Sequence, residues 1–148
     1  MGMPVDVSTE IVIDRPRSEV AAFAADPDNA TAWYENIRSV EWKTGKPLAV
    51  GSRICFVAVF LGKRIDYVYE VTELRPGERL VMRTSEGSFP METVYTWEDA
   101  NGATRMSLRN RGRPRGFPRL VALLLLRRAM RRANRKDLQR LKDVLESP

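Results

Sequence analysis

The chain has 148 residues, 43% of them hydrophobic and 30% charged, which suits one folded domain and excludes an extensively disordered protein. It contains no histidine and a single cysteine, Cys55, so histidine-based acid–base chemistry and an intrachain disulfide are both excluded. The net charge of +6 is uneven, because residues 111–148 hold 12 Lys+Arg against 3 Asp+Glu, whereas residues 1–110 hold 13 against 16.

The first part of the chain alternates and then becomes helical. Residues 5–14 place Val5, Val7, Thr9, Ile11 and Ile13 on one face, and this period of two predicts a half-buried strand. Residues 15–26 follow as a short helix with Pro16 in its first turn. Residues 26–34 read as a second short helix, with Asp26 as its N-cap.

Six further strands are expected before residue 112, in an antiparallel meander. Their predicted ranges are 36–45, 52–60, 64–74, 79–85, 89–98 and 103–110. Asn101-Gly102, between the last two, strongly predicts a tight hairpin turn. Both faces of the strand at residues 52–60 are apolar, so a second subunit or a neighbouring segment is expected to cover its outer face. This observation weakly favours a homodimer.

The last segment has a helical period from near Pro114–Phe117 to near Leu145. Its apolar stripe is Leu120, Leu123, Leu126, Met130, Ala133, Leu141 and Val144, widened by Leu138 and Leu145, and most of its arginines lie opposite. The run Leu120–Leu126 is far shorter than the roughly 20 residues of a membrane span. No aromatic residues or reading motif accompany the arginines, so specific nucleic-acid binding is not expected. The pattern predicts an amphipathic framework helix whose basic face makes at most weak, salt-sensitive contact with anionic membranes.

The order of elements is strand, two short helices, six strands and one long helix. A single amphipathic helix must bury its stripe, and the sheet is its only large partner. We therefore expect one α+β domain over residues 1–148, in which the long C-terminal helix packs on a curved, seven-stranded antiparallel sheet.

Several segments resemble the SRPBCC superfamily, also called START-like or Bet v 1-like, and its polyketide cyclase/dehydrase-like branch. They are "IDRPRSEV" followed by "ADPDNATAW", the strand start "VGSRICF", "YEVTELRPGERLVMR", Tyr95 and Trp97 before "NGATRMSL", and the terminal "RRANRKDLQRLKDVLE". The resemblance covers nearly the whole chain and implies the helix-grip fold, in which sheet and helix enclose a cavity.

The candidate site residues follow from strand alternation and from the helix stripe. Aromatic and apolar side chains of the middle and last strands are assigned inward, towards the helix. Trp33 and Trp42 are expected near a mouth formed by the short helices. The expected ligand-binding set is Trp33, Trp42, Tyr67, Tyr69, Met91, Thr93, Tyr95, Trp97, Met106, Leu123, Arg127 and Met130. The sequence leaves open whether Arg127 points into the cavity or extends to solvent.

Two functions remain open at this point. The first is a binding module for a small hydrophobic or amphipathic molecule, such as a lipid, a polyketide-like compound or an aromatic metabolite. The second is a polyketide cyclase or dehydratase that uses tyrosine and arginine in the same cavity. The sequence offers no catalytic constellation, and we expect no metal and no cofactor. Residues 1–14 lack the features of a signal peptide, so a cytoplasmic location is expected.

Overall fold

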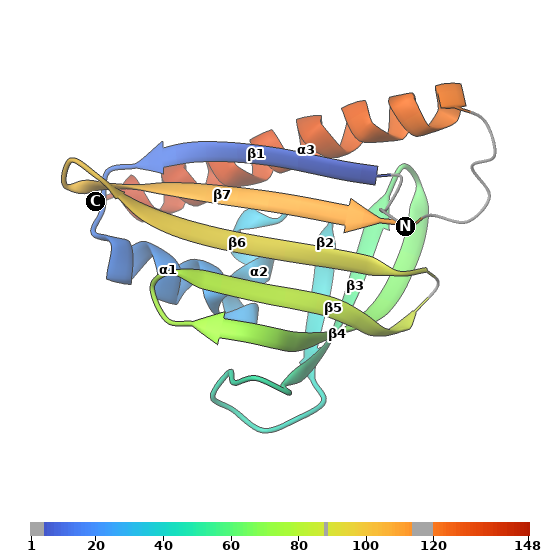
Figure 1. Cartoon of the computed structure of the whole chain (residues 1–148), viewed down its shortest axis with the longest axis horizontal. Coiled ribbons are helices and arrows are strands. Elements are labelled where there is room, and N and C mark those ends of the chain that lie inside the picture. Colours follow the sequence, from blue (N-terminus) through green and yellow to red (C-terminus); the bar gives the residue numbers. More distant parts are fainter. Residues whose placement is uncertain (1–4, 88, 114–119) are drawn as a thin grey trace.

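The computed structural model describes residues 5–87, 89–113 and 120–148. Seven strands, two short helical stretches and one long helix give the predicted α+β fold (Figure 1). The elements are β1 (Val5–Ile13), α1 (Arg17–Ala25), the 3-10 turn η1 (Pro27–Asn29), α2 (Ala30–Trp33), β2 (Ile37–Trp42), β3 (Arg53–Phe60), β4 (Lys63–Arg75), β5 (Arg79–Gly87), β6 (Met91–Ala100), β7 (Ala103–Gly112) and α3 (Leu120–Glu146).

The sheet is antiparallel throughout, with the order β1-β7-β6-β5-β4-β3-β2. The first two strands of the chain therefore form opposite edges of the sheet, and α1, η1 and α2 connect them. β2 and β3 run steeply across the direction of β5, β6 and β7, which shows how strongly the sheet curves (Figure 1). The register of β4 against β5 shifts twice, between Val68 and Tyr69 and between Val71 and Glu73. Such bulges bend a strand and increase its twist, so they contribute to the curvature.

Hydrogen bonds hold the segment that connects the edge strands β1 and β2 in place. The Asp26 carboxylate accepts a hydrogen bond of 3.0 Å from the backbone N–H of Asp28, which caps η1 as the sequence predicts. Arg17 of α1 donates to Asp99, near the end of β6, and to the carbonyl of Gly77 in the β4–β5 turn. These bonds fasten α1 across one end of the sheet.

The long helix α3 packs chiefly along β1 and also contacts α2, so it lies towards one edge of the concave face (Figure 1). Its buried side chains are Leu126, Asn134, Asp137, Leu138 and Leu141. The expectation for Val144 is wrong: this side chain is 43% exposed, and Leu145 packs against the core instead. The reason is the helical period, which carries the buried line through positions 138, 141 and 145. The predicted helix start at 114–117 lies outside the described residues.

The buried residues of the described ranges form two separate clusters. The larger one lies where α1 and α2 meet the sheet and includes Trp33, Trp97, Met106 and Leu138. The smaller one joins Val5 and Val7 of β1 to Leu126 of α3, with Phe60, Leu123 and Met130 packed against it. Apolar side chains therefore do not fill the sheet–helix interface continuously. Leu124 and Leu125 point outward, with exposed fractions of 49% and 60%.

No helix in the described part of the chain is long and apolar enough to cross a membrane. This agrees with the short leucine run that the sequence shows. The basic side of α3 carries Arg128, Arg132 and Arg135, all exposed.

The β6–β7 turn at Asn101-Gly102 has the geometry that the sequence predicts. Asn101 has a φ of 52° and Gly102 a φ of 87°, so both central residues adopt the left-handed region that tight hairpins require. Only glycine occupies this region without steric cost, whereas an alanine there is strained.

Replacing Gly102 with alanine should therefore lower the free energy of unfolding by about 1–2 kcal/mol. The Gly45→Ala variant is the matched control, because Gly45 has no positive φ and an added Cβ would meet nothing within 4 Å. Urea denaturation of both variants measures the difference. Equal stability of the two variants would show that strain at this turn is unimportant.

Candidate ligand-binding cavity

A cavity of about 560 Å³ lies between the concave face of the sheet and α3. Tyr67, Tyr69 and Met91 contribute to its sheet wall, and Met130 and Ala133 to its helix wall. Members of both core clusters line it, so it occupies the space that those clusters leave unfilled. Most of its lining residues are apolar or aromatic, which is typical of a small-molecule site.

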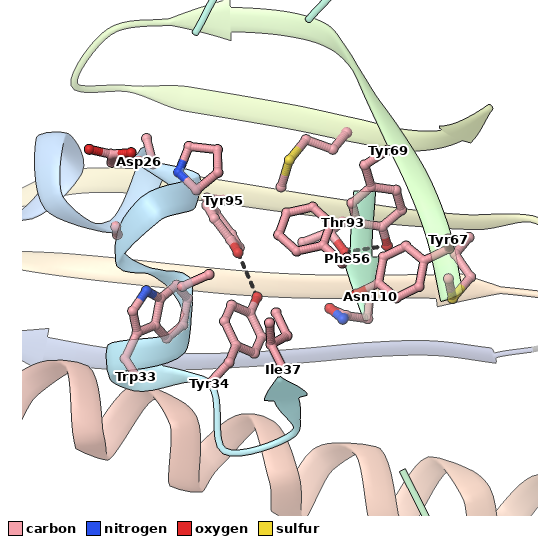
Figure 2. A pocket seen from close by; sticks show the side chains of 16 residues that line it. Asp26, Trp33, Tyr34, Ile37, Phe56, Tyr67, Tyr69, Thr93, Tyr95 and Asn110 are labelled. Carbon is pink, nitrogen blue, oxygen red and sulfur yellow. Dashed lines mark hydrogen bonds between the residues drawn. The ribbon is translucent and has the colours of Figure 1, made fainter. Parts of the chain in front are cut away.

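A smaller space of about 110 Å³ adjoins this cavity at the end covered by the short helices (Figure 2). It is lined by Trp33, Phe56, Met82, Thr93 and Tyr95, among others. The two spaces share six lining residues, namely Tyr34, Ile37, Tyr67, Tyr69, Met91 and Asn110. Together they extend from the short helices to the β3–β4 turn.

Two tyrosine hydroxyls meet in the wall of the smaller space. The hydroxyl oxygens of Tyr34 and Tyr95 lie 2.5 Å apart and share a hydrogen bond (Figure 2). The Trp33 ring packs on both, at centroid distances of 4.1 Å from Tyr34 and 5.8 Å from Tyr95. Burial raises the pKa of Tyr34 and of Tyr95 well above the ordinary value, so both phenols stay protonated at neutral pH.

The other two tyrosines differ in how their hydroxyls are satisfied. The Tyr69 hydroxyl lies 2.8 Å from the Thr93 hydroxyl and bonds to it, and burial raises the pKa of Tyr69 to about 12. Burial also raises the pKa of Tyr67, whose hydroxyl has no hydrogen bond among the described residues. The Tyr67 ring is stacked on Phe56 at a centroid distance of 5.6 Å, which fixes its place in the wall. Tyr67 thus offers a polar atom to whatever fills the cavity.

The helix wall of the larger cavity is partly polar. Asn134 and Asp137 lie there with exposed fractions of 6% and 2%. The Asp137 Oδ1 atom accepts the backbone N–H of Glu35 at 3.1 Å. Burial nevertheless raises the pKa of the Asp137 carboxyl to about 6, because ionising it there is costly. Asn134 Nδ2, and Asn110 Oδ1 on the opposite sheet wall, are buried without a hydrogen-bond partner among the described residues.

The structure brings most of the predicted site residues together. Seven line one or both spaces, namely Trp33, Tyr67, Tyr69, Met91, Thr93, Tyr95 and Met130. Trp97 and Met106 face the same side of the sheet but are buried in the larger core cluster and line neither space. Leu123 likewise packs in the smaller core cluster. Their roles as ligand contacts remain predictions that the cavity geometry does not support.

Two other predicted residues lie elsewhere. Trp42 lines neither space: its indole N–H donates to Asp28 at 2.8 Å, and the Lys46 ammonium lies 5.4 Å from its ring centroid. Arg127 is half-buried and also lines neither space. The pKa of Asp6 lies below its ordinary value, chiefly because Arg109 donates a hydrogen bond to this carboxylate. The charge of Arg127 lowers it further. Asp6 is exposed on β1, so Arg127 extends towards that charged surface, as long basic side chains commonly do.

The expected ligand-binding set lacks several residues that line the cavity, although the helical and strand periods indicate some of them. Asn134 and Asp137 follow Met130 at spacings of four and seven, on the same helix face. Asn110 continues the alternation of Met106 and Leu108 on β7. Tyr34, predicted as the last residue of the second short helix, instead follows α2 in an extended conformation, so the helical period does not give the direction of its side chain.

The described residues contain no group of three or more His, Cys, Asp or Glu side chains that could hold a metal ion. Glu92 is buried between Arg83 and Arg111 at 2.5 Å and 2.6 Å. Its partners are the cross-strand neighbours on β5 and β7, so this carboxylate stabilises the sheet. Asp137 is therefore the carboxyl group that is best placed to act on a ligand in the cavity.

The family model described as polyketide cyclase / dehydrase and lipid transport matches residues 4–146. The chain therefore belongs to that family, within the SRPBCC superfamily that the sequence segments resemble. No curated protein matches the sequence closely enough to count as a relative.

Solved structures confirm the helix-grip fold. TTHA0849 from Thermus thermophilus is 21% identical, with a TM-score of 0.82 over 97% of this chain and 99% of that one. The Zhui aromatase/cyclase from Streptomyces sp. R1128 is 16% identical, with a TM-score of 0.77 over 95% and 93%. Ara h 8.0201 is 13% identical, with a TM-score of 0.71 over 97% and 98%. At these identities the likeness establishes the fold alone.

The Tyr95 hydroxyl has a protein partner and the Tyr67 hydroxyl has none among the described residues, so removing each of them should change stability by a different amount. Tyr95→Phe should lower the free energy of unfolding by about 1–3 kcal/mol, because it leaves the buried Tyr34 hydroxyl without its partner. Tyr67→Phe should change it by less than about 0.5 kcal/mol, because no protein group loses a hydrogen bond. Thermal melts of both variants make the comparison. A larger loss in Tyr67→Phe than in Tyr95→Phe would contradict this assignment of partners.

The raised pKa of Asp137 predicts a pH dependence of stability. A carboxyl whose pKa rises on folding from 3.8 to about 6 contributes stability that is present below pH 4 and lost as the pH rises through about 6. Asp137→Asn keeps an acceptor for the Glu35 N–H but removes the titration. Relative to the wild type, the variant should gain at most about 3 kcal/mol between pH 4 and pH 7.5. A stability difference that does not change with pH, measured by urea denaturation, would contradict the raised pKa.

Proposed function

We propose that this chain binds a small hydrophobic or amphipathic molecule in the cavity between the sheet and α3. The observation that carries this proposal is the space of about 560 Å³ with a largely apolar lining, which lies within the usual size range of small-molecule sites. A lipid, a polyketide-like compound or an aromatic metabolite fits this chemistry. The family description, which includes lipid transport, supports the same class of ligand.

Burial of apolar surface would supply most of the binding free energy. Tyr67, Phe60 and Met130 offer aromatic and flexible apolar surface from three different elements. The mouth is best placed at the β3–β4 turn, where Leu61, Lys63 and Arg64 line the cavity and are exposed. A ligand would enter there and lie along the sheet towards the short helices.

A second candidate function is a polyketide cyclase or aromatase reaction in the same cavity. The Tyr34–Tyr95 hydroxyl pair and the fold of the Zhui aromatase/cyclase favour it. Both phenols stay protonated, and one of them donates to the other, so the second O–H would donate to a substrate carbonyl and stabilise the developing enolate rather than remove a proton. Turnover of a poly-β-ketone substrate by the wild type, lost in Tyr34→Phe, would support this function over simple binding.

The remaining partner assignments are also proposals. Leu124 and Leu125 are exposed beside Arg128, which suits weak contact with an anionic membrane surface when the ligand is exchanged. On the outer face of β3, Cys55 and Val57 are half-buried, and a second copy of the chain would cover them further in a homodimer. The lone free cysteine suits a cytoplasmic location.

Filling the cavity tests the binding function directly. Ala133→Phe places a ring in the helix wall, so it should weaken the binding of pyrene, a fluorescent apolar probe, by at least about tenfold while stability is retained. The matched control is Ala32→Phe, which adds the same ring at an exposed position of α2. Fluorescence titration of the two variants and the wild type measures the effect. Absence of pyrene binding to the wild type, or equal binding by both variants, would refute the proposed site.

A further inference from the structure

The larger cavity contains two buried amide atoms without a partner. Asn134 Nδ2, on the helix wall, and Asn110 Oδ1, on the sheet wall, make no hydrogen bond among the described residues. Asn134 is more than nine-tenths buried, with an exposed fraction of 6%. A buried donor or acceptor without a partner costs free energy, so such atoms in a folded protein call for an explanation.

Most other polar groups of the cavity differ in this respect, with the Tyr67 hydroxyl as an exception. Tyr69 is bonded to Thr93, Tyr34 to Tyr95, and Asp137 accepts the N–H of Glu35. Protein groups therefore satisfy these side chains in the absence of a ligand. The two asparagines differ because neither amide atom has a protein partner among the described residues, although one lies on the helix wall and the other on the sheet wall of the same cavity.

The charges around the cavity limit what the asparagines can bind. Lys63 and Arg64 line it at the exposed β3–β4 turn, where Arg64 is paired with Asp66, and Arg111 is paired with Glu92. Asp137 lies one helical turn beyond Asn134 and is ionised at pH 7.5, given its pKa of about 6. A carboxylate placed beside Asn134 would thus meet the like charge of Asp137, whereas an uncharged group would not be repelled.

We propose that Asn134 and Asn110 recognise a hydroxyl-bearing, uncharged group, such as a phenol or an alcohol, at the buried end of the ligand. A hydroxyl suits both atoms, because its oxygen accepts from Asn134 Nδ2 and its O–H donates to Asn110 Oδ1. This inference rests on the proposed function, since it presupposes a ligand in the cavity. It narrows the ligand class to hydroxylated apolar molecules and orients any acidic group of the ligand towards Lys63 and Arg64.

Three fluorescent probes with one ring system test this recognition: pyrene, 1-hydroxypyrene and 1-pyrenecarboxylate, titrated at pH 7.5. The wild type should bind 1-hydroxypyrene about tenfold more tightly than pyrene, because the hydroxyl gains hydrogen bonds to buried atoms that are otherwise unpaired. It should bind 1-pyrenecarboxylate more weakly than 1-hydroxypyrene, because of the Asp137 charge.

Variants assign the effect to the asparagines. Asn134→Leu has nearly the same shape without the amide, so it should reduce the advantage of 1-hydroxypyrene over pyrene to less than about threefold while pyrene still binds. Asn110→Leu should do the same from the sheet wall, and it serves as the test if Asn134→Leu does not fold. Gln139→Leu is the matched control, because Gln139 is an exposed amide on the same helix. It should leave all three affinities unchanged.

The outcomes separate this inference from the function on which it rests. Equal affinities of the wild type for pyrene and 1-hydroxypyrene would overturn the inference, because water would then satisfy the amides as well as a ligand does. An advantage that persists in both leucine variants would overturn it as well. In either case pyrene still binds, so the proposed function stands. If no probe binds the wild type, the proposed function fails and the inference fails with it.

Discussion

The structure depends on how α3 packs against a sheet that curves away from it. The helix lies along β1, near one edge of the concave face, and meets α2 at its C-terminal half (Figure 1). Leu138 and Leu141 join the main core there, whereas Leu126 joins a separate cluster with Val5 and Val7. Between the two clusters the sheet is too far from the helix for side chains to close the gap. The cavity is a consequence of this geometry and needs no special motif.

The polar groups in the cavity divide into two kinds. The hydroxyls of Tyr34 and Tyr95, and those of Tyr69 and Thr93, satisfy one another in pairs. The asparagines on the facing walls have no such pairing among the described residues. Because an unsatisfied buried group is costly while a paired one is nearly neutral, a ligand gains most where the protein itself leaves polar atoms unpaired. This difference separates the polar groups that bond within the protein from those that are left for a ligand.

The fold could be predicted because each of its elements follows a simple period. Alternation assigned Tyr67, Tyr69 and Met91 to the concave face, and the Asn101-Gly102 dipeptide located the last hairpin. The cavity wall was harder to predict, because which inward side chains border a space depends on the curvature of the sheet. Trp97 faces inward yet packs in the core, and the same alternation cannot distinguish it from Tyr95. Asp137 was missed because a polar residue on an amphipathic helix is usually exposed.

The measurement that tests this account most directly is NMR of the chain labelled with ¹³C at the methionine methyl groups, titrated with pyrene. Met91 lies in the sheet wall of the larger cavity and Met130 in the helix wall, whereas Met106 is fully buried in the core. If a ligand occupies the space between sheet and helix, the Met91 and Met130 signals should shift together at one saturating concentration while the Met106 signal stays close to its original position. Signals of Met91 and Met130 that do not respond to the probe would contradict the account.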